Sequence, residues 1–175
     1  TRELLYTVYK QLGLTESQIN DLEAMVLDAP NRKPGKGALD NLIPLVYSRK
    51  NGGPRWLESH TVERLFYYRL ERDPNVVGFV TQVRCPGVTR QVRTGAHRSN
   101  PTLDFLVFYK DRIVLVECKT EEPMEKLAEK KELEWIYQDE KWINAVHIEY
   151  AKSRGIDAEV HASNRLFSIE LQNAE

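Results

Sequence analysis

Apolar residues recur at helical spacing over the first 30 residues of the chain. Residues 4–12 place leucine and valine one helical turn apart, and Gly13 follows them, which predicts a helix that ends at glycine. Thr15 and Gln18 then form a capping-box pattern, which predicts a second helix over residues 16–28. The chain is therefore expected to begin with a helical hairpin.

The middle of the chain changes from a helical to a strand-like pattern. A helix is predicted from Trp56 to about Arg72, and Asp73 and Pro74 follow it. After this helix, apolar and β-branched residues gather in short runs that predict four strands, over residues 76–83, 88–93, 103–109 and 112–119.

Helical patterns return over residues 121–153, including Trp135 and Trp142, and Gly155 ends them. Two short final strands are predicted, over residues 156–161 and 166–171. This order of elements predicts an α/β or α+β domain around a small mixed β-sheet flanked by helices, with an N-terminal helical arm.

A length of 175 residues fits one domain with a small appendage. Residues 31–37 (NRKPGKG) are polar, basic and rich in residues that break secondary structure, which predicts a linker. We therefore expect a helical arm and linker over residues 1–36 and the main domain over residues 37–175. The chain begins at Thr1 rather than at methionine, which is typical of a piece of a longer protein.

The composition excludes several classes of protein. With 41% hydrophobic and 29% charged residues and no apolar stretch of membrane-spanning length, the chain is expected to be soluble and to have no membrane partner. Cys85 and Cys118 form no CxxC pair, so the sequence supports neither a zinc knuckle nor a disulfide framework. We expect a reducing compartment, the cytoplasm, with Cys118 as a small buried side chain.

The net charge of -1 hides an uneven distribution along the chain. Residues 31–98 hold thirteen Lys and Arg against five Asp and Glu, whereas both flanking segments are acidic. Residues 84–98 contain no acidic side chain and are interrupted by glycine and proline, which predicts a basic hairpin or loop. On charge alone, a DNA-binding surface and a solvated turn are equally well supported. The arginines that would bind phosphates are Arg84, Arg90, Arg93 and Arg98.

Two apolar runs joined by a polar turn predict a β-hairpin near the middle of the chain. With the turn centred on residues 110–111, Asp104 lies directly opposite Glu117, with Cβ atoms about 5 Å apart. Lys119 lies on the same face as Glu117, because side chains two positions apart on a strand share a face. Two facing carboxylates are destabilising unless a positive charge joins them, which makes a divalent cation the natural partner.

Oxygen ligands without paired histidines or thiolates favour Mg²⁺, with Mn²⁺ as a substitute. A lysine beside such a site can position or deprotonate a water molecule and stabilise negative charge in a transition state. This set of side chains fits phosphodiester hydrolysis. The alternative is structural, with Asp104 as a turn former and Glu117 and Lys119 as an ordinary surface pair.

Glu63 is a third candidate carboxylate, because it belongs to the apolar stripe of the helix predicted from Trp56. Helices usually turn such a stripe inward, and an unpaired buried charge is costly, so Glu63 is expected to be either paired or functional. The structural alternative is a partner such as His60 or an arginine from elsewhere.

These residues, with others between residues 55 and 162, form a pattern that resembles a known family. It consists of a helix with a glutamate, an Asp-Pro turn, a strand that ends in glutamine, a catalytic hairpin and a later helix: Ser59, Glu63, Phe66, Leu70, Asp73, Pro74, Val76, Gln82, Asp104, Phe105, Glu117, Lys119, Ala145, Tyr150, Ala151 and Gly155. The pattern resembles the PD-(D/E)xK nucleases, and within them the TnsA-like endonuclease subunit of heteromeric transposases. Leu103 replaces the proline that names the motif, and Val83 stands where this subfamily often has proline, but neither departure removes a ligand.

The resemblance implies a restriction endonuclease-like core and a metal-dependent DNA endonuclease. Glu63, Asp104 and Glu117 would hold one or two Mg²⁺ ions, Lys119 would assist the attacking water, and Gln82 would support the site. The substrate would be double-stranded DNA at transposon ends, where the enzyme cleaves the non-transferred strand. A DDE-type transposase and an AAA+ regulator would be its partners, which implies association with the nucleoid.

Two other functions stay open at this point. One is a stand-alone repair, restriction or junction-cleaving nuclease of the same superfamily, which differs from the first only in its partners. The other is a non-catalytic DNA-binding or assembly module in which the carboxylates are structural. Metal binding separates the second from both nucleases, because a binding module has no need of Mg²⁺ or Mn²⁺ at Asp104 and Glu117.

Overall fold

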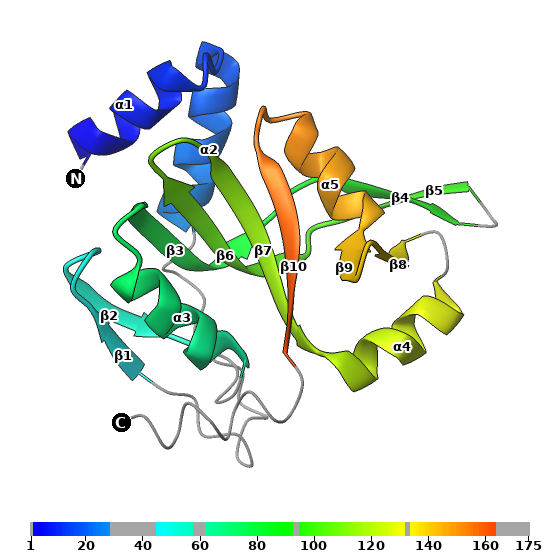
Figure 1. Ribbon diagram of the computed structural model, residues 1–175. Helices are drawn as coiled ribbons and strands as arrows, with labels where there is room; N and C mark the ends of the chain where they lie inside the picture. The colour runs from blue at the N-terminus through cyan, green and yellow to red at the C-terminus, as the bar shows by residue number, and fades with distance from the viewer. Residues whose placement is uncertain (1, 29–44, 58–61, 93–94, 132–133, 164–175) are drawn as a thin grey trace, which may run out of the picture.

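The computed structural model describes most of the chain as a mixed α+β fold with five helices and a small central sheet (Figure 1). The described residues are 2–28, 45–57, 62–92, 95–131 and 134–163. The linker predicted over residues 31–37 and the strand predicted over residues 166–171 lie outside them.

The central sheet has four strands in the order β10-β7-β6-β3. β6 pairs antiparallel with both β3 and β7, whereas β10 runs parallel to β7, so the predicted small mixed sheet is confirmed. β6 and β7 are buried along most of their length because helices cover both faces of the sheet. The strands are β3 (Val76–Arg84), β6 (Thr102–Tyr109), β7 (Ile113–Thr120) and β10 (Asp157–Ser163).

One face of the sheet packs against α3 (Val62–Arg72). Tyr67 of this helix meets Phe79 of β3 edge to face, with ring centroids 5.5 Å apart, and Phe79 in turn meets Phe105 of β6. Alternating residues of β7, Val114 and Val116, complete this layer. The aromatic packing fixes the N-terminal turn of α3 near the ends of β3 and β6.

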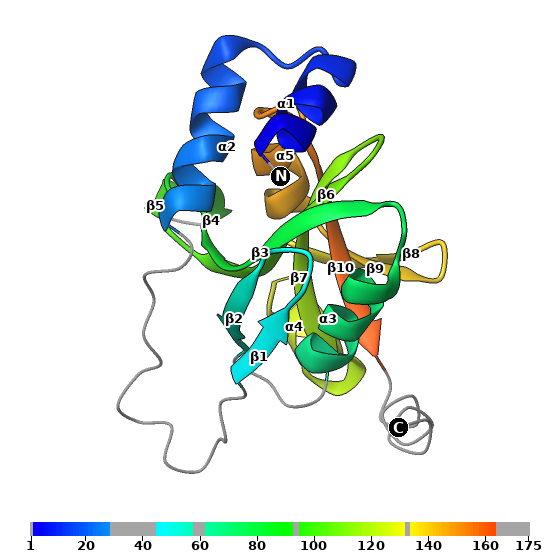
Figure 2. The ribbon, with the colours of Figure 1, turned by 90° about the vertical axis from the view of Figure 1, so that its left-hand side faces the viewer.

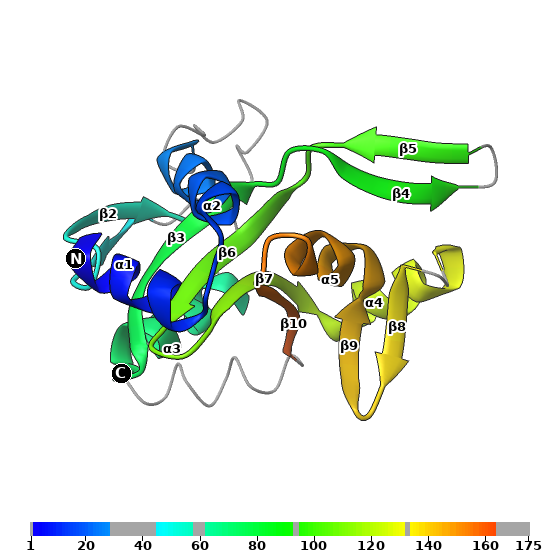
Figure 3. The same ribbon diagram turned by 90° about the horizontal axis from the view of Figure 1, so that it is seen from above.

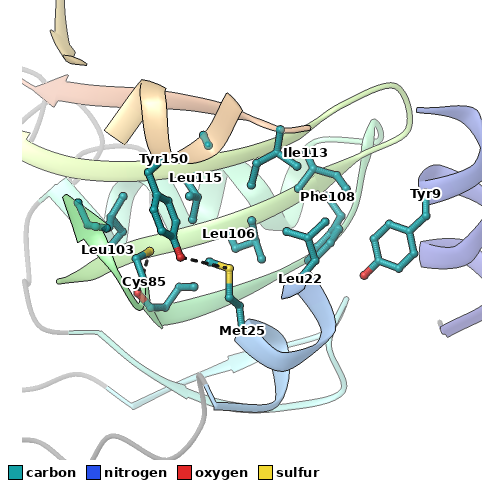
Figure 4. Close-up of a cluster of buried hydrophobic side chains, with 14 of the residues drawn as sticks. Tyr9, Leu22, Met25, Cys85, Leu103, Leu106, Phe108, Ile113, Leu115 and Tyr150 are labelled. Atoms are coloured by element: carbon teal, nitrogen blue, oxygen red, sulfur yellow. Dashed lines mark hydrogen bonds between the residues drawn. The ribbon is translucent and has the colours of Figure 1, made fainter. Parts of the chain in front are cut away.

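The other face packs against the two N-terminal helices and a late one: α1 (Arg2–Gln11), α2 (Glu16–Asp28) and α5 (Ala145–Lys152). Leu22 and Met25 of α2 lie over Leu106 of β6, and Tyr150 of α5 reaches the sulfur of Met25 through its hydroxyl group (Figure 4). Tyr9 of α1 meets the ring of Phe108 at 6.2 Å. The N-terminal helices therefore share one hydrophobic core with the sheet (Figure 2).

The turn between α1 and α2 forms as the sequence predicts. The Thr15 amide donates to Oε1 of Gln18 at 2.9 Å, and the Gln18 amide donates back to the Thr15 hydroxyl at 3.3 Å, which is the reciprocal capping box. Gly155, with φ of 70°, lies so close to this turn that a Cβ atom there would be 2.7 Å from Leu14. Glycine therefore allows the end of α5 to approach the helical hairpin.

Three antiparallel hairpins extend from the central sheet. The basic segment forms one of them, β4–β5, as predicted, and it extends from the ends of β3 and β6 on the side of the molecule where α5 lies (Figure 3). The hairpin strands are β1 (Leu45–Ser48) with β2 (Gly53–Trp56), β4 (Val88–Val92) with β5 (Gly95–Ser99), and β8 (Trp135–Gln138) with β9 (Lys141–Asn144).

The predicted start of the first internal helix is wrong. Trp56 ends strand β2, which pairs with β1, and α3 begins only at Val62. The apolar residues at 56 and 57 share helical spacing with those of α3, but Leu57 is buried against the same layer from a strand end. A short apolar run in the sequence does not distinguish a buried strand from a buried helix segment.

The continuous helical pattern predicted over residues 121–153 is also wrong. A helix, α4, covers Glu121–Lys130, and α5 follows later, but the β8–β9 hairpin separates them. Asp139 and Glu140 have φ of 50° and 59°, the conformation that a tight two-residue hairpin turn requires. Trp135 and Trp142 therefore lie on strands, not helices.

Candidate active site

The predicted register of the β6–β7 hairpin is confirmed. β6 and β7 pair with Phe105 opposite Val116, and the same register continued by one residue places Asp104 opposite Glu117. The backbone amide of Cys118 donates a hydrogen bond to Oδ2 of Asp104 at 2.6 Å, which holds this carboxylate across the two strands.

Gln82 extends this pair into a row across three strands. β3 pairs with β6 so that Thr81 and Val83 face Phe105 and Leu103, which places Gln82 between them opposite Asp104. The row therefore consists of Gln82, Asp104 and Glu117.

Glu63 reaches this row from the first turn of α3. Its side chain is buried, with 5% of the residue exposed, although it is a glutamate. Oε2 of Glu63 accepts a hydrogen bond of 3.5 Å from the side-chain amide of Gln82. The structure thus brings together Glu63, Asp104, Glu117 and Gln82, which the sequence had singled out separately.

The carboxylates of this group are close enough to repel one another. Burial raises the pKa of Asp104 well above its ordinary value, and the negative charges of Glu63 and Glu117 raise it further. The Cys118 amide and the Lys119 ammonium act in the opposite direction but do not offset these effects. Asp104 is therefore a buried acid surrounded by like charges, an arrangement that is unfavourable unless a cation joins it.

Lys119 is held as a cation beside the carboxylates. Burial alone would lower its pKa, but the Glu117 carboxylate, 2.5 Å from its ammonium nitrogen, and Asp104 raise the pKa above its ordinary value. The ring of Trp135 lies 5.8 Å from the same nitrogen. Lys119 is thus suited to donate hydrogen bonds and supply positive charge, rather than to remove a proton from water.

The donor set fits Mg²⁺ or Mn²⁺, which prefer carboxylate oxygens. Within the described part of the chain, no three His, Cys, Asp or Glu side chains are arranged to hold a metal ion as they stand. In this arrangement Glu117 is paired with Lys119, and Glu63 accepts a hydrogen bond from Gln82. A divalent cation among the three carboxylates would relieve the repulsion between them.

The basic arginines that the structure describes on the β4–β5 hairpin do not share one face. Arg84 is exposed at the end of β3, and Arg98 is exposed on β5 with its guanidinium group against Gly87. Arg90 lies opposite His97, one position along the hairpin from the pair of Thr89 and Arg98, so Arg90 and Arg98 lie on opposite faces. Arg93 lies outside the described residues.

Arg90 faces the body of the domain. Its guanidinium group is 3.6 Å from Oε1 of Glu134, which is itself 9% exposed and also pairs with Lys131. The side-chain amide of Asn144 donates to the same Glu134 carboxylate at 3.4 Å. Arg90 therefore ties the basic hairpin to the start of strand β8.

The sequence pattern did not identify the aromatic neighbours of Lys119. Trp135 contacts Lys119, and His147 of α5 packs edge to face against Trp135, with ring centroids 6.2 Å apart. The sequence signal that could have found Trp135 is the pair of short apolar runs, residues 135–137 and 142–143, on either side of a polar turn.

No protein-family model matches this chain, and no curated protein matches it in sequence. None of the described helices is long and apolar enough to cross a membrane.

Proposed function

We propose that the chain is a Mg²⁺-dependent DNA endonuclease with a restriction endonuclease-like core. The observation that carries this proposal is the buried Asp104, which has Glu63 and Glu117 as its charged neighbours and Lys119 beside Glu117. A structural aspartate is normally buried against a positive partner, which lowers its pKa, whereas here the pKa is raised. Groups perturbed in this way are typical of active sites.

The proposed roles follow from these positions. Asp104, Glu117 and Glu63 would hold Mg²⁺ or Mn²⁺. The bound ion would polarise the phosphate and make its water ligand more acidic. Lys119, held as a cation, donates a hydrogen bond to the attacking water and stabilises the negative charge that develops on the phosphate oxygens.

We further propose, from the resemblance in sequence, that the enzyme is a TnsA-like subunit. It would cleave the non-transferred strand of double-stranded DNA at transposon ends. Its partners would be a DDE-type transposase and an AAA+ regulator, and it would act at the nucleoid in the cytoplasm. Because a subunit of this kind works in a complex, metal binding is the first property to test, since it does not depend on the partners.

We expect Mn²⁺ to bind the wild-type chain, and the Asp104→Asn variant to bind it at least about 100-fold more weakly. Asparagine keeps an oxygen that accepts the hydrogen bond from the Cys118 amide, so the hairpin retains its contact while one charged ligand is lost. Isothermal titration calorimetry of both proteins measures the difference, with and without a short DNA duplex.

Asp111→Asn is the matched control, because Asp111 is exposed at the turn of the same hairpin. This variant should bind Mn²⁺ as the wild type does. Equal binding by the wild type and Asp104→Asn would show that the metal site is elsewhere. Absence of binding by the wild type, with and without DNA, would contradict the nuclease proposal and favour a DNA-binding module.

The two faces of the basic hairpin should behave differently in DNA binding. Arg98→Ala is expected to weaken binding to duplex DNA and to reduce the slope of log affinity against log salt by about one. Arg90→Ala is expected mainly to lower the free energy of unfolding, by about 1–3 kcal/mol, because it breaks a largely buried contact with Glu134. Fluorescence anisotropy over a range of salt concentrations and urea unfolding measure the two effects.

Arg112→Ala is the control for charge alone, since Arg112 is exposed at the opposite end of the central sheet. It should leave the salt slope unchanged. A larger loss of DNA affinity for Arg90→Ala than for Arg98→Ala, at equal stability, would show that the inner face of the hairpin binds DNA.

A further inference from the structure

Gln82 has a backbone conformation that is unusual for its residue type. Among the described non-glycine residues, φ is positive at Gln82 and at the two turn residues of the β8–β9 hairpin. The turn residues need this conformation to close their hairpin, but Gln82, with φ of 56°, lies inside strand β3. A left-handed backbone costs a residue with a Cβ atom free energy, so the fold must maintain it against this cost.

The residue with this left-handed backbone, Gln82, also makes a buried polar contact. Gln82 is 7% exposed, and its side-chain amide is the donor to Oε2 of Glu63. Gln82 also lies opposite Asp104, so a single residue joins the carboxylate from α3 to the row of carboxylates on the sheet.

The chemistry of glutamine suits this position. An amide donates a hydrogen bond to a carboxylate without neutralising it, and its carbonyl oxygen is uncharged. A lysine or arginine at this place would compete with a metal ion for Glu63, and a carboxylate would add to the repulsion around Asp104. Glutamine orients Glu63 while leaving its negative charge available to a cation.

We propose that Gln82 is a positioning residue that orients Glu63 for metal binding, and that the left-handed backbone at residue 82 serves this contact. The inference rests on the proposed function and adds a role to it. The residue acts through Glu63, so it affects the affinity for metal rather than the chemical step.

The first test is the affinity for Mn²⁺, measured by calorimetry. Gln82→Ala should bind Mn²⁺ about 10–100-fold more weakly than the wild type, the usual effect of removing a group that orients a metal ligand. Gln91→Ala, which removes an exposed glutamine from strand β4, should bind as the wild type does. DNA cleavage by Gln82→Ala should recover to within a few fold of the wild-type rate at saturating Mn²⁺.

The second test needs no metal. Gln82→Gly should melt about 2–4 °C higher than Gln82→Ala, because glycine adopts positive φ without strain and alanine does not. In a double-mutant cycle with Glu63→Ala, the effects of the two alanine substitutions on stability should not add, since each removes the same contact. Equal melting temperatures, or strict additivity, would overturn the inference.

The outcomes separate the two proposals. Binding of Mn²⁺ by the wild type and by Gln82→Ala with equal affinity would overturn the role of Gln82 and leave the proposed function intact. Failure of the wild type to bind Mn²⁺ with or without DNA would contradict the proposed function and remove the positioning role with it.

Discussion

Asp104→Asn is expected to reduce metal-dependent DNA cleavage at least about 1,000-fold, equivalent to about 4 kcal/mol of transition-state stabilisation. The substitution removes the carboxylate at the centre of the proposed metal site and leaves its hydrogen bond with Cys118 in place. Affinity for duplex DNA should stay equal or rise, because a negative charge is lost near the phosphates. Cleavage of a labelled duplex, with any partner subunits that activity requires, and a separate binding assay measure the two properties.

The stability of this variant separates loss of chemistry from loss of fold. Because burial and the neighbouring carboxylates raise the pKa of Asp104, the metal-free wild type loses stability as the pH rises above about 4, where an unfolded aspartate ionises. Asparagine does not ionise, so Asp104→Asn should be more stable than the wild type at neutral pH without metal, by about 0.5–2 kcal/mol. A variant that is inactive yet more stable would show that the Asp104 carboxylate serves function at a cost to stability.

Asp111→Asn should keep both the cleavage rate and the metal-free stability of the wild type, since Asp111 is exposed at the hairpin turn. Metal-dependent cleavage that survives in Asp104→Asn would place the active site elsewhere. A decrease in metal-free stability for Asp104→Asn would show that this carboxylate is a structural group.

The β6–β7 hairpin was predictable from the sequence because its information is local. The two apolar runs of β6 and β7 are joined by a short turn, so the centre of the turn alone determines that Asp104 faces Glu117. The capping box at Thr15 was predictable for the same reason, since its donors and acceptors lie within three residues.

The long-range features of the site could not be predicted in this way. The contact of Glu63 with Gln82 depends on how α3 packs across the sheet, and the positive φ of Gln82 has no signal in its residue type. Arg90 and Arg98 lie on opposite faces because of the register of the β4–β5 hairpin. A count of charges along the sequence carries no information about this register.

The helix predicted across residues 135–144 is wrong because the spacing of apolar residues there fits both a helix and a hairpin. Trp135 and Trp142 are seven residues apart, which fits two helical turns as well as a hairpin. The structure pairs the two strands around Asp139 and Glu140, and this hairpin places Trp135 beside Lys119. Neither residue type is typical enough of a tight turn to outweigh the helical spacing.

As the pH decreases from 6.5 to 4, His147 is expected to lower the free energy of unfolding by about 2–4 kcal/mol. This side chain is 6% exposed, and its Nδ1 has no hydrogen-bond partner among the described residues. Burial lowers its pKa to about 4, the cations Arg90, Lys119 and Lys131 act in the same direction, and Glu134 opposes them. His147 is therefore neutral in the folded protein, whereas an unfolded histidine gains a proton near pH 6.5.

The direction of the effect follows from these two values. Stability from the neutral His147 is complete above pH 6.5 and is lost as the pH falls through the range down to about 4, because only the unfolded state takes up the proton there. His161, whose ring lies 4.6 Å from that of Phe66 and whose pKa burial also lowers to about 4, adds to the loss over the same range.

Urea unfolding at several pH values between 4 and 7 measures this dependence in the wild type and in His147→Gln. The glutamine variant has a different absolute stability, but its free energy of unfolding should fall less steeply with decreasing pH, by the contribution of one histidine. His97→Gln replaces an exposed histidine on β5 and should leave the wild-type slope unchanged. Equal slopes for His147→Gln and the wild type would mean that His147 takes up its proton in the folded state. The contact between α5 and β8 beside Lys119 would then contain a protonated histidine.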